Sequence, residues 1–263
     1  MSRLPQRIVC LTTETVEVLY ALGEQERIVG ISGYTVRPPQ ARKEKPKVFA
    51  FTSGDIEKIL AVKPDLVLTF SDLQSEISRD LIKAGVPVYA FNTRSVDDIL
   101  GMIETLGRLV GAEDKALALV AELEQQIEQT RKIAAERIAR NGKRPRVYFE
   151  EWDEPLISSI RWASELIDIA GGEDIFAEQS RSPLAQDRRP TAEAVIARAP
   201  DIIIGSWCGK HFRPERVAAR PGWAAIPAVH NERMHEIKSA IILTPGPVAI
   251  SEGLPLLLNI FDQ

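Results

Sequence analysis

The chain has 263 residues and a formal net charge of −4, with 44% apolar and 27% charged residues. This composition is typical of globular proteins and allows one large domain or two smaller ones. The acidic balance argues against broad nucleic-acid binding, because such a surface needs basic residues to meet the phosphates. Cys10 and Cys208 are the only cysteines, which excludes a disulfide framework and a four-cysteine metal site.

The sequence contains no apolar run that approaches the ~20 residues of a membrane-spanning helix. Its first seven residues are basic but lack the apolar segment and small-residue cleavage site of a secretory signal. We therefore expect a protein that does not span a membrane. It is cytoplasmic if Met1 is the native start, and exported if a signal was removed.

The first third of the chain alternates short apolar runs with helical patterns. Strands are predicted at 7–11, 27–31, 65–70 and 86–91, and helices at 12–22, 55–62 and 73–84. Gly23 follows the first helix as a C′ residue, and Ser53 or Asp55 stands near the N-cap of the second helix. Strands that alternate with helices at this spacing indicate βαβ units around a mostly parallel sheet.

Residues 113–140 contain neither glycine nor proline and predict one long helix. Apolar residues recur in it at three- and four-residue steps, which gives a single apolar stripe. The predicted stripe consists of Leu117, Val120, Leu123, Ile127, Ala134 and Ile138. The helix is either a surface helix of one domain or a rigid strut that joins two lobes.

The strand and helix pattern restarts after the long helix. Strands are predicted at 146–150 and 201–205, and helices at 160–170 and 192–198. A final helix is predicted from Pro247 towards Phe261, bent or broken at Pro255.

An internal repeat favours the interpretation in which the long helix joins two lobes. Residues 56–68 align without gaps on residues 192–204, at an offset of 136 residues, and each copy reads as a helix, a Pro-Asp break and a buried strand. The prediction is an α/β protein with two α/β lobes, mostly parallel sheets and one long bridging helix. The N-terminal lobe is assigned to 1–112, the connecting helix to 113–140 and the C-terminal lobe to 141–263.

Ligands of open α/β sheets bind outside the carboxyl ends of the strands, so the residues that follow each strand are candidate ligand contacts. Aromatic rings with a few polar groups suit a large, flat, partly apolar ligand held between the lobes. The alternative is that the tryptophans among the candidates complete the hydrophobic core at the strand ends and do not contact a ligand. The candidates are Thr13, Tyr34, Phe51, Phe70, Glu151, Trp152, Trp162 and Trp207.

Catalytic and metal-binding patterns are weak. The chain has neither a phosphate-binding glycine loop nor a Gly-x-Ser-x-Gly turn. Its three histidines all lie in the second half, which disfavours a transition-metal site between the lobes, and Cys10 lies in a predicted buried strand. Glu150 and Glu151 are adjacent in a strand and therefore point to opposite faces, with Arg161 as a candidate partner. We expect no catalytic residue and no metal site.

Several segments together resemble the cobalamin- and siderophore-type substrate-binding proteins of ABC importers, which have a helical backbone between two lobes. The resemblance covers nearly the whole chain and is nearest to the cobalamin-binding members. It is carried by residues 8–23, 29–34, 56–67, 113–140, 170–176 and 199–201.

The resemblance implies a non-catalytic, monomeric protein that delivers a small molecule to permease subunits from the periplasm or cell surface. By position, Tyr34, Phe51 and Phe70 correspond to aromatic residues that face the corrinoid ring. Glu57 and Glu193 correspond to glutamates that dock onto permease arginines. The alternative is that neither glutamate has a binding partner. Each is then an exposed glutamate in the first turn of a helix, where the helix dipole favours a negative charge.

Four segments depart from the family pattern and leave the ligand open. They are the loop at 12–17, the segment 182–187 without the expected tryptophan, the segment 238–247 without an evident Asp/Arg pair, and the acidic segment 150–155. A cobalamin-like corrinoid, another metal chelate or a smaller polar ligand is compatible, and no catalytic cofactor is expected. The alternative function is a cytoplasmic ligand-handling protein or an enzyme on the same scaffold.

Overall fold

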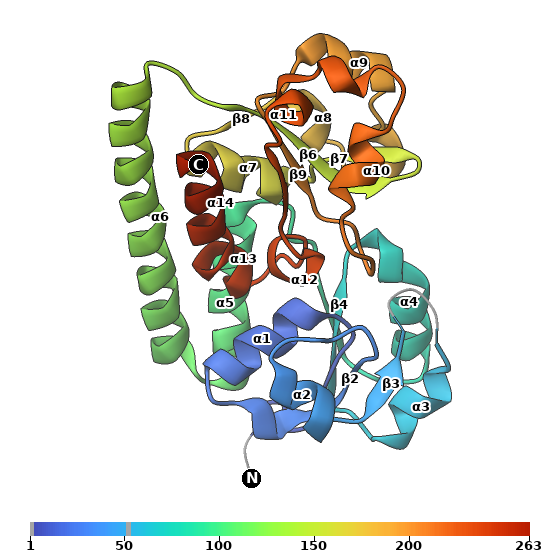
Figure 1. Ribbon diagram of the computed structural model, residues 1–263. Coiled ribbons are helices and arrows are strands. Elements are labelled where there is room, and N and C mark those ends of the chain that lie inside the picture. Colours follow the sequence, from blue (N-terminus) through green and yellow to red (C-terminus); the bar gives the residue numbers. More distant parts are fainter. Residues whose placement is uncertain (1–2, 51–53) are drawn as a thin grey trace. The chain divides into compact units, whose positions relative to one another are not determined.

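The computed structural model describes residues 3–50 and 54–263, which divide into two compact units (Figure 1). The first unit runs to Thr93 and includes Asp97–Glu122, and the second comprises Arg94–Val96 and Leu123–Gln263. Each unit has its own five-stranded sheet.

The sheet of the first unit is entirely parallel, in the order β3-β2-β1-β4-β5. The central strand β1 pairs with β4 in the register Ile8↔Leu66, and β4 pairs with β5 in the register Val67↔Val88. The four predicted strands are therefore observed, and β3 adds an edge. The strands are β1 (Ile8–Cys10), β2 (Ile28–Ser32), β3 (Lys47–Phe49), β4 (Leu66–Phe70) and β5 (Val88–Phe91).

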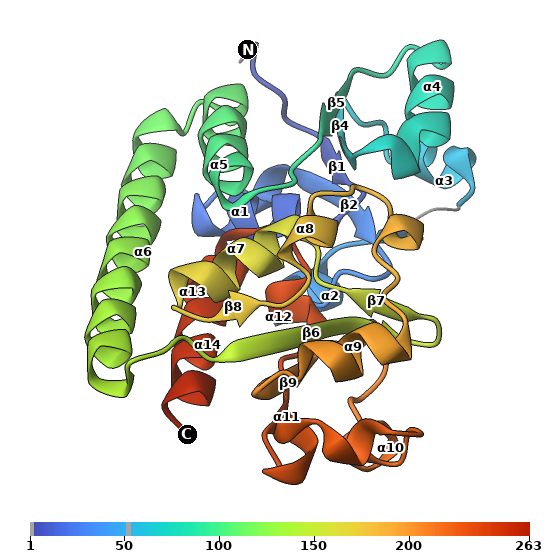
Figure 2. The same cartoon turned by 90° about the horizontal axis from the view of Figure 1, so that it is seen from above.

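Helices cover both faces of this sheet, with α3 and α4 on one side and α1 and α5 on the other (Figures 1 and 2). On the first side, Val9 and Val67 pack with Ile59 of α3 and Leu81 of α4. The helices are α1 (Thr13–Ala21), α2 (Pro39–Glu44), α3 (Ile56–Ala61), α4 (Ser75–Lys83) and α5 (Val96–Val110). As predicted, Gly23 follows α1 with a positive φ of 74°. Of the two predicted cap residues, Asp55 caps α3 by accepting the Glu57 N–H at 3.0 Å, and Ser53 lies outside the described residues.

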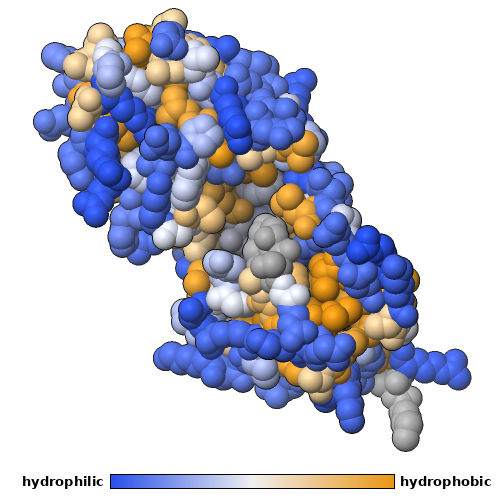
Figure 3. Space-filling view, turned by 90° about the vertical axis from the view of Figure 1, so that its right-hand side faces the viewer, coloured by the Kyte–Doolittle hydropathy of each residue, from blue (hydrophilic) through white to orange (hydrophobic). Residues whose placement is uncertain are grey.

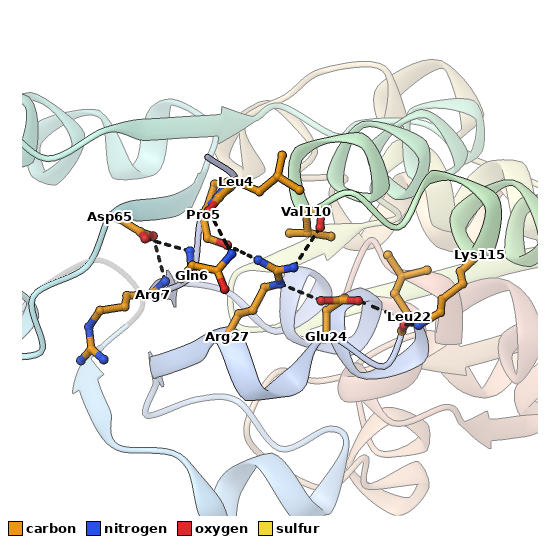
Figure 4. Close-up of polar contacts among 10 residues, drawn as sticks. All are labelled: Leu4, Pro5, Gln6, Arg7, Leu22, Glu24, Arg27, Asp65, Val110 and Lys115. Atoms are coloured by element: carbon orange, nitrogen blue, oxygen red, sulfur yellow. Dashed lines mark hydrogen bonds and ion pairs between the residues drawn. The ribbon is translucent and has the colours of Figure 1, made fainter. Parts of the chain in front are cut away.

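Polar contacts hold the segment that leads into β1 in place (Figure 4). Arg27 donates to the carbonyls of Pro5 and Val110, at 2.5 and 3.2 Å, and pairs with Glu24 at 2.6 Å. Lys115 donates to the Leu22 carbonyl at 2.8 Å, just after α1 ends. These contacts join the start of the chain, α1, α5 and the first turn of the long helix.

The sheet of the second unit is mostly parallel, in the order β10-β9-β6-β7, and β8 also pairs with β6. β9, β10 and β8 run parallel to their partners, whereas β7 is antiparallel to β6. The predicted α/β class with two mostly parallel sheets is confirmed. The strands are β6 (Arg146–Asp153), β7 (Leu156–Ser158), β8 (Glu173–Asp174), β9 (Ile202–Gly205) and β10 (Met234–Glu236).

The core on one face of this sheet joins Tyr148 and Ile203 to Val195 of α9, Val217 of α10 and Ala228 of α11. The remaining helices include α7, which packs against α14 and β8. The helices are α7 (Arg161–Ile169), α8 (Ala177–Ser180), α9 (Ala192–Arg198), α10 (Pro214–Ala218), α11 (Pro227–His230), α12 (Ser239–Ile242), α13 (Pro247–Ser251) and α14 (Gly253–Asp262).

The final helix is interrupted as predicted, but the predicted position of the bend or break, Pro255, is wrong. The interruption lies at Glu252, between α13 and α14. Pro255 lies in the first turn of α14, where a missing N–H costs nothing because the first N–H groups of a helix have no partner within it.

The long helix predicted over 113–140 is observed as α6 (Glu113–Asn141). Its residues are divided between the two units, up to Glu122 in the first and from Leu123 in the second. Leu117 is wrongly placed in the predicted stripe, because it is 43% exposed. The buried stripe keeps the other central residues of the prediction, but has Ala116 in place of Leu117 and Arg137 in place of Ile138, and it includes polar side chains. It consists of Ala116, Val120, Leu123, Ile127, Thr130, Ala134 and Arg137.

Candidate ligand-binding site

The carboxyl end of β6 is the most highly charged strand end of the second unit. Glu150 is fully buried there, and its carboxylate accepts two N–H groups of Arg220, at 2.6 and 2.8 Å. The indole N–H of Trp207 donates to the same carboxylate at 3.0 Å, and the Ser206 N–H donates to the Glu150 carbonyl at 2.9 Å. Glu150 therefore fastens the loop that follows β9 to the end of β6.

Glu151 has a different partner from its neighbour, as expected for adjacent residues of a strand. Its carboxylate lies 2.6 Å from Arg188, a buried side chain that also donates to the Ser158 carbonyl at 2.6 Å. The suggestion that Arg161 is the partner is wrong, because Arg161 pairs with Glu165 one turn further along α7.

Trp152 is the next residue of β6 and is half-buried. The Lys210 ammonium lies 4.0 Å from the centroid of its ring and 5.0 Å from that of Trp207. Lys210 also forms an ion pair with Asp153. Such cation–π contacts stabilise the ammonium against the ring face.

The other two candidate tryptophans are buried, each with only 2% of its surface exposed. The Trp162 N–H donates to the Ile242 carbonyl at 2.9 Å. Trp207 makes an edge contact with Phe212, with ring centroids 5.1 Å apart. Both rings pack as core residues at the strand ends, as the alternative interpretation described, and their ligand contact stays a prediction.

The candidates of the first unit differ in accessibility. Tyr34, in the loop after β2, is 69% exposed, and Thr13 is half-buried at the start of α1. Phe70 ends β4 and is 6% exposed. Phe51 lies outside the described residues. Much of the visible surface is hydrophilic, and hydrophobic residues interrupt it in separate patches (Figure 3).

A buried carboxyl group at the start of α1 was not among the predicted site residues. Glu14 is 3% exposed and accepts the Thr12 hydroxyl, and burial raises its pKa to about 7. Glu17 lies one turn further and approaches Arg37 at 3.7 Å. In the segment Thr12–Glu17 only Thr13 is a predicted ligand contact, and the two glutamates at this strand–helix junction are the signal that points to the buried carboxyl. Cys10, predicted to be a core residue, is fully buried.

Glu57 and Glu193 lie in the first turns of α3 and α9, and both are exposed. Thr191 caps α9 by accepting the Ala194 N–H at 3.2 Å. The Glu193 N–H and the Thr191 side chain hold the pKa of Glu193 below its usual value. The two glutamates therefore occupy the same helix position in the two units.

Within residues 3–50 and 54–263, no group of three His, Cys, Asp or Glu side chains is arranged to hold a metal ion. None of the described helices combines the length and apolarity needed to cross a membrane.

The profile of the family described as "Periplasmic binding protein" matches residues 8–241, which span both sheets. The chain belongs to this family. This periplasmic binding protein is 28% identical over 258 residues to the uncharacterized ABC transporter substrate-binding lipoprotein YvrC of Bacillus subtilis, covering 95% of this chain and 78% of YvrC. It is 29% identical over 217 residues to a vitamin B12-binding protein of Yersinia pestis, covering 81% and 73% of the two chains.

Solved structures of other periplasmic binding proteins have the same fold. The heme-binding protein RhuT of Roseiflexus aligns with a TM-score of 0.84 and 24% identity, over 98% of both chains. The vitamin B12-binding protein BtuF of Vibrio cholerae aligns with a TM-score of 0.77 and 23% identity, over 98% of this chain and 97% of BtuF. At these identities the structures establish the fold that the periplasmic binding proteins share.

Proposed function

We propose that the chain is the substrate-binding component of an ABC importer and that its ligand is a corrinoid or a related metal chelate. The observation that carries the proposal is the family match over residues 8–241, together with relatives called vitamin B12-binding protein. The proposed ligand is a small molecule, and the proposed partners are permease subunits.

The chemistry of the strand ends supports a flat ligand. Tyr34 offers an exposed ring in the first unit, and Trp152 offers a partly exposed ring beside Lys210 in the second. Aromatic rings bind conjugated ligands by stacking, and the few polar groups beside them orient the ligand. The prediction that the ligand lies between the lobes remains part of this proposal.

We infer a non-catalytic role. Glu150 and Glu151 are the candidate acid and base of the enzymatic alternative, but the oxygens of Glu150 already accept three donors, and Glu151 is paired with Arg188. A general acid or base needs an oxygen within reach of a substrate proton, and these two carboxylates are engaged in holding loops. As in the lipoprotein relative, we propose an exported protein, acting as a monomer in the periplasm or on the cell surface.

The test is direct binding of cyanocobalamin and iron protoporphyrin IX to the purified chain. We expect the absorbance of one of them to remain with the protein after desalting and to raise its melting temperature. Tyr34→Ala should weaken that binding roughly tenfold, because it removes one stacking ring.

Tyr89→Ala is the matched control, since Tyr89 is 38% exposed on the edge strand β5, and packs on Phe91. Its affinity should equal that of the unsubstituted protein. Failure to retain either compound would contradict the metal-chelate assignment, and conversion of a retained compound to a product would contradict the non-catalytic role.

A further inference from the structure

The loop that follows β9 is anchored at both ends and presents one lysine at its tip. Ser206 and Trp207 bond to Glu150 at the start of the loop, and the Phe212 N–H donates to Glu236 at 3.1 Å at its end. Between these anchors, residues 208–211 are exposed. The backbone therefore fixes the position of the loop, whereas the Lys210 side chain extends from its tip.

Lys210 places a positive charge on an aromatic surface. Its ammonium lies 4.0 Å from the Trp152 ring centroid, and its side chain is 37% exposed. A ligand that approaches the exposed part of Trp152 therefore meets this ammonium. An ammonium has three N–H donors, and Asp153 occupies one of them, so donors remain for a ligand.

The other charges at this strand end are already balanced. Arg220 is held by Glu150, and Arg188 by Glu151. These two guanidinium groups already bind carboxylates of the protein. They are also less accessible than Lys210, with 19% and 2% of their side chains exposed. Lys210 is thus the cation of this group that a ligand reaches most easily.

We propose that Lys210 is a specificity-determining residue, which selects flat conjugated ligands that carry a carboxylate at the edge of the ring. This inference rests on the proposed function and names the charge class of its ligand. The ring stacks at Trp152 while the ammonium donates to the carboxylate, a charge-assisted bond that an amide or ester forms more weakly. Asp153 orients the ammonium and competes with the ligand for it.

The test compares ligands that share a ring but differ in edge charge. One pair is iron protoporphyrin IX and its dimethyl ester, and the other is the monocarboxylic acids of cyanocobalamin and cyanocobalamin itself. We expect the acid of a bound pair to bind roughly three- to tenfold more tightly than the neutral form. Lys210→Met should bring this ratio close to one, Lys210→Arg should preserve it, and Asp153→Asn should increase it.

Lys132→Met is the charge-matched control, because Lys132 is exposed on α6, and it should leave the ratio unchanged. Equal binding of acid and neutral forms by the unsubstituted protein would overturn the inference and leave the proposed function standing. The inference is likewise overturned, with the proposed function still standing, if Lys210→Met keeps the full ratio of the affinities for acid and neutral form, or if it weakens the binding of both forms equally. If neither ring system binds at all, the metal-chelate function fails and the inference fails with it.

Discussion

Asp65 and Asp201 make the same hydrogen bonds in the two units. The Asp65 carboxylate accepts the Arg7 N–H at 2.8 Å, just before β1 (Figure 4), and Asp201 accepts the Arg146 N–H at 2.9 Å, where β6 begins. In return, the Asp65 and Asp201 N–H groups donate to the carbonyls of the same two arginines, at 2.9 and 2.8 Å. Each aspartate therefore sets the starting point of a parallel strand pair.

The residues before these aspartates match as well. Lys63 and Ala199 are at equivalent positions of the repeat and have positive φ angles of 48° and 42°. A non-glycine residue rarely adopts this conformation, so its presence in both copies shows that the turn itself is repeated. The Pro-Asp pair that follows leads directly into the next strand, β4 in the first unit and β9 in the second. The internal repeat is thus a structural one.

We expect Asp65→Ala and Asp201→Ala each to lower the free energy of unfolding by about 0.5–1.5 kcal/mol, because backbone N–H groups at the start of β1 and β6 lose a charged acceptor. Asp65→Asn should have a smaller effect, since its carbonyl oxygen still accepts one of the two N–H groups that Asp65 receives from Gln6 and Arg7. Urea denaturation provides the measurement. Asp187→Ala, at an exposed position, should change stability little, and an equal loss there would refute the role assigned to Asp65.

The Glu150–Arg220 pair gives a second stability prediction. Glu150→Met should cost about 3–5 kcal/mol, because it leaves a partly buried guanidinium without its acceptor. Glu150→Met with Arg220→Met should cost less than either single substitution, since neither charge is then left alone. Urea denaturation of the four proteins gives the coupling free energy.

Glu104 and Arg108 form the matched control, an exposed pair one turn apart in α5 with a 2.9 Å separation. Truncating Glu104 should cost no more than about 0.5 kcal/mol. If the Glu150 cycle gives a coupling as small as that of the α5 pair, Glu150 does not anchor the loop that carries Trp207.

The buried carboxyl of Glu14 predicts a pH dependence of stability. Its pKa is raised from 4.5 to about 7 by desolvation, which disfavours the charged form in the folded protein. A raised pKa in the folded state contributes stability that is fully present below pH 4.5 and is lost as the pH rises through 7. Glu14→Gln should remove this loss, because glutamine stays neutral while it can still accept the Thr12 hydroxyl.

Thermal melting from pH 4.5 to 8.5 tests this expectation. The melting temperature of Glu14→Gln relative to the unsubstituted protein should rise across the interval, by an amount equivalent to about 2–4 kcal/mol. Glu128→Gln, on the exposed side of α6, should give a flat difference. A flat difference for Glu14→Gln as well would show that its carboxyl titrates at an ordinary pKa in the folded protein.

The sequence pattern predicted those strands and helices whose formation depends mainly on residues that are close together in the chain. The apolar runs that became β1, β4, β6 and β9 and the uninterrupted run that became α6 were all identifiable in the sequence. The short pieces β7, β8 and α12 were not predicted, because two to four residues carry no periodicity. Leu117 shows that an apolar residue at the correct spacing can still face solvent when a smaller one, Ala116, lies at the contact.

The candidate site was less predictable, because its decisive contacts join distant residues. Glu150 pairs with a residue 70 positions away, and Glu151 with one 37 positions away. Nothing in the segment Glu150–Pro155 distinguishes acids fastened by arginines from acids that face a ligand. The choice of Arg161 followed proximity in the sequence, whereas the fold brought Arg188 and Arg220 to the end of the strand.

Glu57 and Glu193 carry the last prediction, which concerns transport. Both lie at the same position of the repeat, in the first turn of α3 or α9, and both are exposed. We expect Glu57→Ala with Glu193→Ala to abolish ligand uptake in cells that contain the permease, because the acidic groups proposed to meet permease arginines are gone. Ligand affinity in solution should stay within about twofold, since neither side chain follows a strand end.

The control replaces two other exposed first-turn glutamates, Glu76 of α4 and Glu215 of α10, with alanine. It removes the same charge from the same kind of position, so uptake should persist. The low pKa of Glu193 adds a pH criterion, because a carboxylate held below its usual pKa stays ionised through mildly acidic conditions. Complex formation with the permease should therefore weaken with added salt but not between pH 7 and 5.5. Equal loss of uptake in the control pair would refute the docking role of Glu57 and Glu193.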